Sequence, residues 1–126
     1  MTTEIENLKN HVARLLNAPA MPVHEMITNP GYAQNRHQGV YALFAPSSGA
    51  PAYIGKTNCA RDGVAQRIWD HANGISSPVT SEMAPDEREL FRQQYSVRTI
   101  EIADSRLRSR VELFAIAVIN PLKNRL

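Results

Sequence analysis

Two short runs of residues decide the fold of this chain, Gly39-Val40-Tyr41-Ala42-Leu43-Phe44 and Ala52-Tyr53-Ile54-Gly55-Lys56-Thr57. Both are rich in β-branched and aromatic residues, which favour strands. The segment 46–51 between them contains proline, serine and glycine, which supply the backbone angles that a tight connection needs. The sequence therefore predicts a β-hairpin, around which the rest of the chain is arranged.

The predicted hairpin carries polar groups on both of its strands. Because successive side chains of a strand alternate between faces, Tyr41 and Tyr53 can project from the same face as cross-strand neighbours. Gly55 has no Cβ and allows a close approach by backbone or ligand, and Lys56 follows it at the mouth of the next loop. An anion could be bound at this point.

Apolar periodicity and capping residues predict the remaining elements. Apolar residues recur at helical spacing from Thr3 to Asn17, and Thr3 with Glu6 forms a capping box, so an amphipathic helix is expected there. The interpretation that follows is a linking loop over 17–29, a helix over 63–72 with Asp62 as its N-cap, a loop over 74–84, a helix over 85–94, a third strand over 95–102 and a helix over 105–119. This order predicts a small domain of mixed helices and strands, α/β in the broad sense (α+β).

Composition sets broad limits on what the protein can be. A chain of 126 residues with 43% hydrophobic content suits one folding unit, and a formal charge of +2 is too small to argue for nucleic acid by itself. Cys59 is the only cysteine, which excludes an internal disulfide framework and fits a reducing, cytoplasmic compartment. No run approaches the ~20 apolar residues of a membrane span, so we expect no membrane association.

Two helices carry charged groups that need an explanation. Arg67 and His71 are four residues apart and share a face of the helix over 63–72, where a solvated surface is the ordinary interpretation. Glu112 is the only charge in the run 111–119, and an ionised carboxylate among apolar neighbours needs a compensating partner. That partner can be a salt bridge with Arg108 or Arg67, or a divalent metal ion.

The hairpin resembles the signature of the GIY-YIG nuclease family. Gly39-Val40-Tyr41 corresponds to the first motif, with Val40 in place of isoleucine. Tyr53-Ile54-Gly55-Lys56 corresponds to the second motif. The similarity continues in order through Arg67 and His71, then Glu112, and a closing Pro-x-x-Asn element that ends at Asn124. Histidine at position 71 replaces the tyrosine of some members, as in the restriction-enzyme-like ones.

The resemblance implies a fold and a division of the chain. The family's layout is a small three-stranded antiparallel sheet flanked by helices, here with an added N-terminal helix. Residues 37–126 are expected to form the GIY-YIG-like domain, and residues 1–36 an N-terminal helix and linker packed on it. The first 35 or so residues match no part of the family pattern.

The resemblance also implies a metal-dependent DNA endonuclease, a phosphodiester hydrolase that uses one Mg²⁺ or Mn²⁺ ion. Glu112 is the implied metal ligand, and Arg67 is implied to bind the scissile phosphate. Tyr53 would orient water or phosphate and Asn124 would hold the geometry of the cleft. Lys56 would assist the general base, a role for which Tyr41 and His71 compete; the position of Tyr41 in the signature favours it.

Other functions remain open on the sequence alone. A non-catalytic nucleic-acid-binding module on the same fold is the main alternative, and a structural adaptor whose tyrosines only pack is another. We expect DNA as the partner and a monomer or weak homodimer. The sequence does not specify the target site, nicking or double-strand cutting, or a role in restriction, repair, mobile elements or toxicity.

Overall fold

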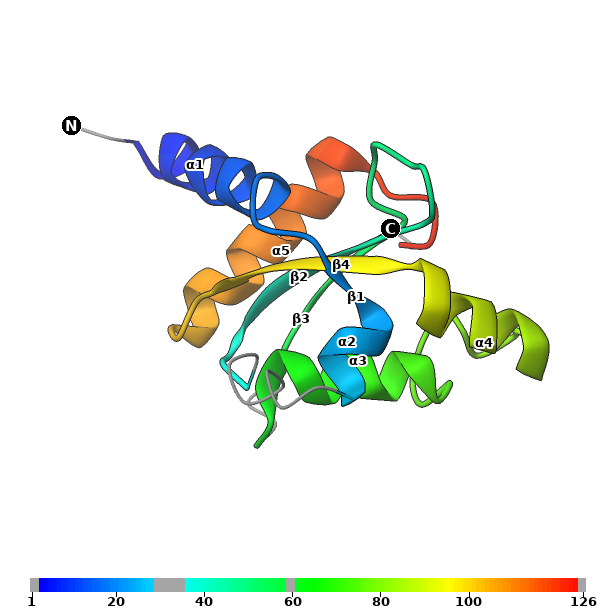
Figure 1. Cartoon of the computed structure of the whole chain (residues 1–126). Helices are drawn as coiled ribbons and strands as arrows, with labels where there is room; N and C mark the ends of the chain where they lie inside the picture. Colours follow the sequence, from blue (N-terminus) through cyan, green and yellow to red (C-terminus); the bar gives the residue numbers. More distant parts are fainter. Residues whose placement is uncertain (1–2, 29–35, 59–60, 125–126) are drawn as a thin grey trace.

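The computed structural model describes residues 3–28, 36–58 and 61–124. Its elements follow the order α1 (Glu4–Leu16), β1 (Met21–Pro22), α2 (Val23–Thr28), β2 (Gly39–Phe44), β3 (Tyr53–Lys56), α3 (Gly63–Ala72), α4 (Pro85–Gln94), β4 (Ser96–Glu101) and α5 (Ser105–Ile119). The strands form one sheet in the order β1-β4-β2-β3, and every pairing is antiparallel (Figure 1). The fold is therefore α+β, as expected.

The predicted hairpin forms the centre and one edge of the sheet. Tyr41 of β2 is the register partner of Gly55, and Leu43 is the partner of Tyr53. All of β2 is buried because it lies between β3 and β4, whereas β3 has a free side in the sheet order. Because β3 is an edge strand, polar side chains from other elements can reach its free side.

Helices cover both faces of the sheet, with α1 and α5 on one side and α2, α3 and α4 on the other (Figure 1). Alternation along β2 divides its side chains between two apolar cores. Val40, Ala42 and Phe44 pack with α1 and α5, while Tyr41 and Leu43 pack with α2, α3 and Phe91 of α4. The tyrosine of the first motif thus faces α3.

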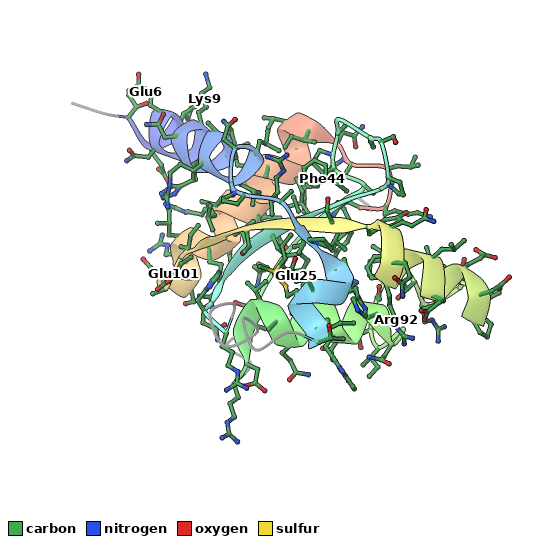
Figure 2. The ribbon with its side chains drawn as sticks, in the orientation of Figure 1. Glu6, Lys9, Glu25, Phe44, Arg92 and Glu101 are labelled. Carbon is green, nitrogen blue, oxygen red and sulfur yellow. The ribbon has the colours of Figure 1, made fainter. Side chains whose placement is uncertain are left out.

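Helix α1 is an integral part of the first core. The predicted capping box is present, since Thr3 accepts from the Glu6 N–H and Glu6 accepts from the Thr3 N–H. Val12 and Leu15 are buried against the sheet, whereas Figure 2 shows Glu6 and Lys9 on the outer side of the helix. The division of the chain at residues 36 and 37 into two segments stays a prediction.

Two expectations about the N-terminal half were wrong. The segment 17–29 is not only a loop, because it contains β1 and α2, and β1 makes the sheet four-stranded where three strands were predicted. Met21 pairs with Val97, and the Val23 N–H donates to the Tyr95 carbonyl. Two strand residues and six helical residues are too few to establish a period, so tertiary contacts decide these elements.

The start of α3 also differs from the prediction. Asp62 stands at the N-cap position, but its side chain makes no capping hydrogen bond. It instead lies 3.7 Å from the Arg36 guanidinium. Gly63 follows with a φ of 55°, a left-handed conformation that a glycine adopts without strain. Within the described parts of the chain, no helix is long and apolar enough to cross a bilayer.

Candidate active site

The buried hydrogen bond between Tyr41 and His71 lies at the centre of the candidate site. The Tyr41 Oη and His71 Nε2 atoms are 2.8 Å apart, and the two side chains are 1% and 0% exposed. Tyr41 comes from the central strand and His71 from the last turn of α3. The helical face that carries Arg67 and His71 is therefore directed at the sheet, which excludes the interpretation of a solvated surface.

Tyr53 completes an aromatic cluster over the same face of the hairpin. Its ring centroid lies 6.3 Å from that of Tyr41 and 5.3 Å from that of His71. Gly55 is needed for this packing, because a Cβ there would lie 2.6 Å from Tyr41 Cζ and 2.9 Å from Tyr53 Cε2. The second motif requires glycine because the phenol of the first motif occupies that space.

Arg67 is held beside the Tyr41 hydroxyl by two other groups. Its guanidinium donates to Asp70 Oδ2 at 3.1 Å and to the Ser76 carbonyl at 3.3 Å. Burial acts to lower the pKa of Arg67, but Tyr41 and Asp70 outweigh it and raise that pKa above its usual value. A fixed, permanently charged guanidinium with further N–H donors suits the binding of a phosphate.

Glu112 reaches the free edge of β3 from α5. The backbone N–H of Lys56 lies close enough to its carboxylate to influence its pKa, and the charge of Glu112 acts on both Tyr41 and Tyr53. Burial raises the pKa of Glu112, while the Lys56 ammonium and N–H oppose that shift. Lys56 Nζ itself donates to Asn58 Oδ1 at 2.6 Å.

The predicted salt bridges of Glu112 are absent from the described part of the structure, where no ion pair within 4.0 Å includes this residue. Arg108 donates instead to the carbonyls of Thr57 and Ile102, and Arg67 pairs with Asp70. Glu112 is thus a half-buried carboxylate whose closest cationic influence is Lys56. The carboxylate oxygens of Glu112 can therefore coordinate a hard cation such as Mg²⁺.

Asn124 closes the same edge of the sheet. Its Oδ1 accepts the Ile54 N–H and its Nδ2 donates to the Ile54 carbonyl, each at 2.8 Å. Ile54 stands at a non-hydrogen-bonded pair of the antiparallel ladder, so its backbone N–H and carbonyl point away from β2. Lys56, two residues further along β3, has the same orientation. Asn124 therefore satisfies the outward groups of Ile54, and Glu112 lies near the next outward N–H of β3, that of Lys56.

The pKa values of the aromatic groups follow from their burial. Burial raises the pKa of Tyr41 above its ordinary value of 10.0, and the Arg67 charge opposes that rise. Burial also raises the pKa of Tyr53, which is the less buried phenol. Burial, with the Arg67 charge, lowers the pKa of His71 to about 3, so its imidazole is neutral at neutral pH.

A divalent metal fits the donor set at Glu112. Among the described residues no group of three or more His, Cys, Asp and Glu side chains is placed to hold a metal, so a site rich in protein ligands is absent from that part of the chain. One carboxylate with waters and substrate oxygens is the type of site that Mg²⁺ accepts, since it retains much of its hydration shell. Glu112 is the residue that would hold it.

Comparison with known proteins adds evidence about the fold. No family model and no curated protein matches the sequence. The magnesium-bound GIY-YIG N-terminal endonuclease domain of UvrC from Thermotoga maritima matches with a TM-score of 0.50 and 18% identity, over 95% of this chain and 98% of that chain. A tyrosine-to-phenylalanine mutant of that domain with its catalytic divalent cation matches over 96% and 98%, with a TM-score of 0.50 and 18% identity. The chain has the GIY-YIG fold.

The GIY-YIG fold brings together all the residues that the sequence proposed for the site. Tyr41, Tyr53, Arg67 and His71 gather between the hairpin and α3, and Lys56, Glu112 and Asn124 meet at the outer edge of β3. The 96% coverage includes most of the N-terminal segment that the sequence motifs did not reach. A pocket of about 460 Å³ lined by Phe44, the hairpin turn and Arg98 contains none of the site residues.

Sequence reasoning missed the residues that hold this candidate site in place. Asp70 fixes Arg67, and Ser77 contacts His71 Nδ1 at 2.6 Å from a segment interpreted only as a loop. The spacing of Arg67 and Asp70, three residues apart on a helix, was a signal for the first contact. Nothing local marks Ser77, because it meets His71 only when the chain folds back after α3.

We expect Asn124→Ala to destabilise the fold by about 1–3 kcal/mol, because the Ile54 N–H and carbonyl lose their partners. Urea denaturation measures the free energy of unfolding. Leu122→Ala is the matched control, since Leu122 is 88% exposed in the same segment. An Asn124→Ala protein as stable as this control would contradict the edge-strand role.

We expect the ring of His71 to remain neutral from about pH 8 to about pH 4, because its folded pKa is lowered to about 3. The unfolded chain takes up that proton near the ordinary value of 6.5, so stability is full above 6.5 and falls as the pH drops toward 3. NMR titration of the histidine ring signals and urea denaturation against pH measure the two effects. A His71 signal that titrates near neutrality would disprove the assignment.

Proposed function

We propose that this chain is a metal-dependent DNA endonuclease that hydrolyses phosphodiester bonds with a single divalent cation, Mg²⁺ or Mn²⁺. The observation that supports it most is that the charges of Arg67, from α3, and Glu112, from α5, both act on the Tyr41 hydroxyl of the hairpin. The similar solved structures are endonuclease domains bound to a catalytic divalent cation. The fold supports a nuclease, and the side chains supply the chemistry.

The proposed roles follow from the position and charge of each side chain. Arg67 binds the scissile phosphate with the N–H donors that Asp70 and Ser76 leave free, and its fixed charge stabilises negative charge as it develops on the phosphoryl oxygens. Glu112 would hold a divalent cation, which when bound would supply positive charge at the phosphate. Asn124 holds β3, and with it Tyr53 and Lys56, in register.

Tyr41 is the proposed general base, acting on water at the phosphate. A phenol with a raised pKa is a poor base unless cations stabilise its ionised form, and Arg67 is the cation beside it. His71 is a poor candidate for this task because its pKa is lowered to about 3 and its Nε2 faces Tyr41. Lys56 adds positive charge near Glu112 at the same strand edge.

A non-catalytic nucleic-acid-binding module is the second candidate. The observation in its favour is the burial of Tyr41 and His71, which are 1% and 0% exposed in the absence of substrate. In a binding module, both groups would serve to pack the hairpin against α3. Cleavage that requires a divalent metal separates this candidate from an enzyme.

We expect the wild-type protein to nick supercoiled plasmid with Mg²⁺ and to lose that activity with EDTA. Glu112→Gln should abolish cleavage while fold and DNA affinity are retained, because it removes the carboxylate charge with little change in volume. Glu101→Gln is the matched control, since Glu101 is an exposed carboxylate at the C-terminal end of β4 (Figure 2). Mg²⁺-dependent cleavage by Glu112→Gln would refute the metal assignment.

We expect Tyr41→Phe to lower turnover about 10²- to 10⁴-fold, because it removes the proton acceptor and keeps the ring. Since burial raises the pKa of Tyr41, the wild-type rate should climb into alkaline conditions and not level off near neutrality. Single-turnover cleavage at a series of pH values measures both. A wild-type profile with a midpoint near pH 6 to 7, or full activity in Tyr41→Phe, would assign the base elsewhere.

A further inference from the structure

The hydroxyl of Ser77 makes three buried contacts. Ser77 is 2% exposed, and its Oγ lies 3.2 Å from the Val79 N, 3.1 Å from the Thr80 N and 2.6 Å from His71 Nδ1. A serine hydroxyl offers one proton and two lone pairs. The two backbone N–H groups can only donate, so they occupy both lone pairs. The single Ser77 proton is therefore donated to His71 Nδ1.

This count assigns the tautomer of His71. Since Nδ1 accepts from Ser77, the proton of the neutral imidazole resides on Nε2, which faces the Tyr41 oxygen at 2.8 Å. His71 thus donates to Tyr41, and the tyrosine oxygen is the acceptor. The Arg67 guanidinium beside the same oxygen is also only a donor.

The opposite tautomer leaves the buried groups poorly satisfied. With a proton on His71 Nδ1, three N–H groups would point at the two lone pairs of the Ser77 hydroxyl. The Ser77 hydroxyl proton would also lose His71 Nδ1 as its acceptor. Unsatisfied polar groups in a buried site carry a large penalty. The segment is also fixed from a second point, because the Thr80 hydroxyl donates to the His71 carbonyl.

We propose that Ser77 is a positioning residue that holds His71 in the Nε2-protonated tautomer, so that His71 donates a hydrogen bond to Tyr41. The Tyr41 proton is then not shared with His71, and negative charge that develops on the Tyr41 oxygen is stabilised by the His71 and Arg67 donors. The tautomer follows from the structure alone, while its consequence for cleavage rests on the proposed function.

Nitrogen-15 NMR of the histidine ring tests the assignment without any activity. The wild-type protein should show His71 protonated on Nε2, and Ser77→Thr, which keeps the hydroxyl, should show the same tautomer. Ser77→Ala should show a population protonated on Nδ1, because the donor to that atom is gone. Thr80→Val is the matched control, since it removes the bond to the His71 carbonyl and leaves both ring contacts in place. Nδ1 protonation in the wild type, or an unchanged tautomer in Ser77→Ala, would overturn the proposal.

Cleavage kinetics of the same variants test the consequence for Tyr41. Ser77→Ala should cleave about 10- to 100-fold more slowly, the effect of one misdirected buried hydrogen bond, and Ser77→Thr should restore most of the rate. Thr80→Val should cleave at close to the wild-type rate at a temperature where both are folded. Equal slowing in Ser77→Ala and Thr80→Val would show a structural role only. A wild-type protein that shows the assigned tautomer but never cleaves DNA would refute the proposed function and leave the role of Ser77 standing.

Discussion

The buried hydroxyl of Tyr41 is the constraint on which this structure depends. A phenol on the central strand of a sheet must find a hydrogen-bond partner, and His71 Nε2 provides one at 2.8 Å. That bond fixes the rotation of α3 against the sheet, because the face carrying His71 must point at Tyr41. Arg67, one turn earlier, is thereby placed beside the same oxygen. The need of one buried phenol for a hydrogen-bond partner therefore brings both a guanidinium and an imidazole to it.

The free edge of β3 is a second constraint. Edge strands leave backbone groups without partners, and proteins cover such edges or pair them. Here Asn124 satisfies both outward groups of Ile54, and Glu112 lies near the outward N–H of Lys56. Of these two side chains, Glu112 is also the proposed metal ligand, and Asn124 also holds the strand that carries Tyr53 and Lys56. Stability and the candidate site therefore depend on the same contacts, and a variant at Asn124 affects both.

The hairpin and the long helices were predictable because their signals are local. The alternation and turn residues around Tyr41 and Tyr53 predicted the hairpin, and the apolar period after Thr3 predicted α1. Strand β1 and helix α2 were not predictable in this way. They are stabilised by pairing with β4 and by burial of Val23 and Met26 beneath the sheet, contacts between segments far apart in the sequence.

The sequence by itself determined which chemical groups the chain carries and their order, from the tyrosine and glycine of each motif to Glu112 and Asn124. It also determined that Arg67 and His71 share a helical face, because helix geometry is local. Only the tertiary structure decided where that face points, that Glu112 lies near Lys56 and not in an ion pair with an arginine, and that Ser77 reaches His71. Burial and hydrogen-bond partners depend on how distant segments meet, so the protonation of His71 and the environment of Tyr41 can be read only from the folded chain.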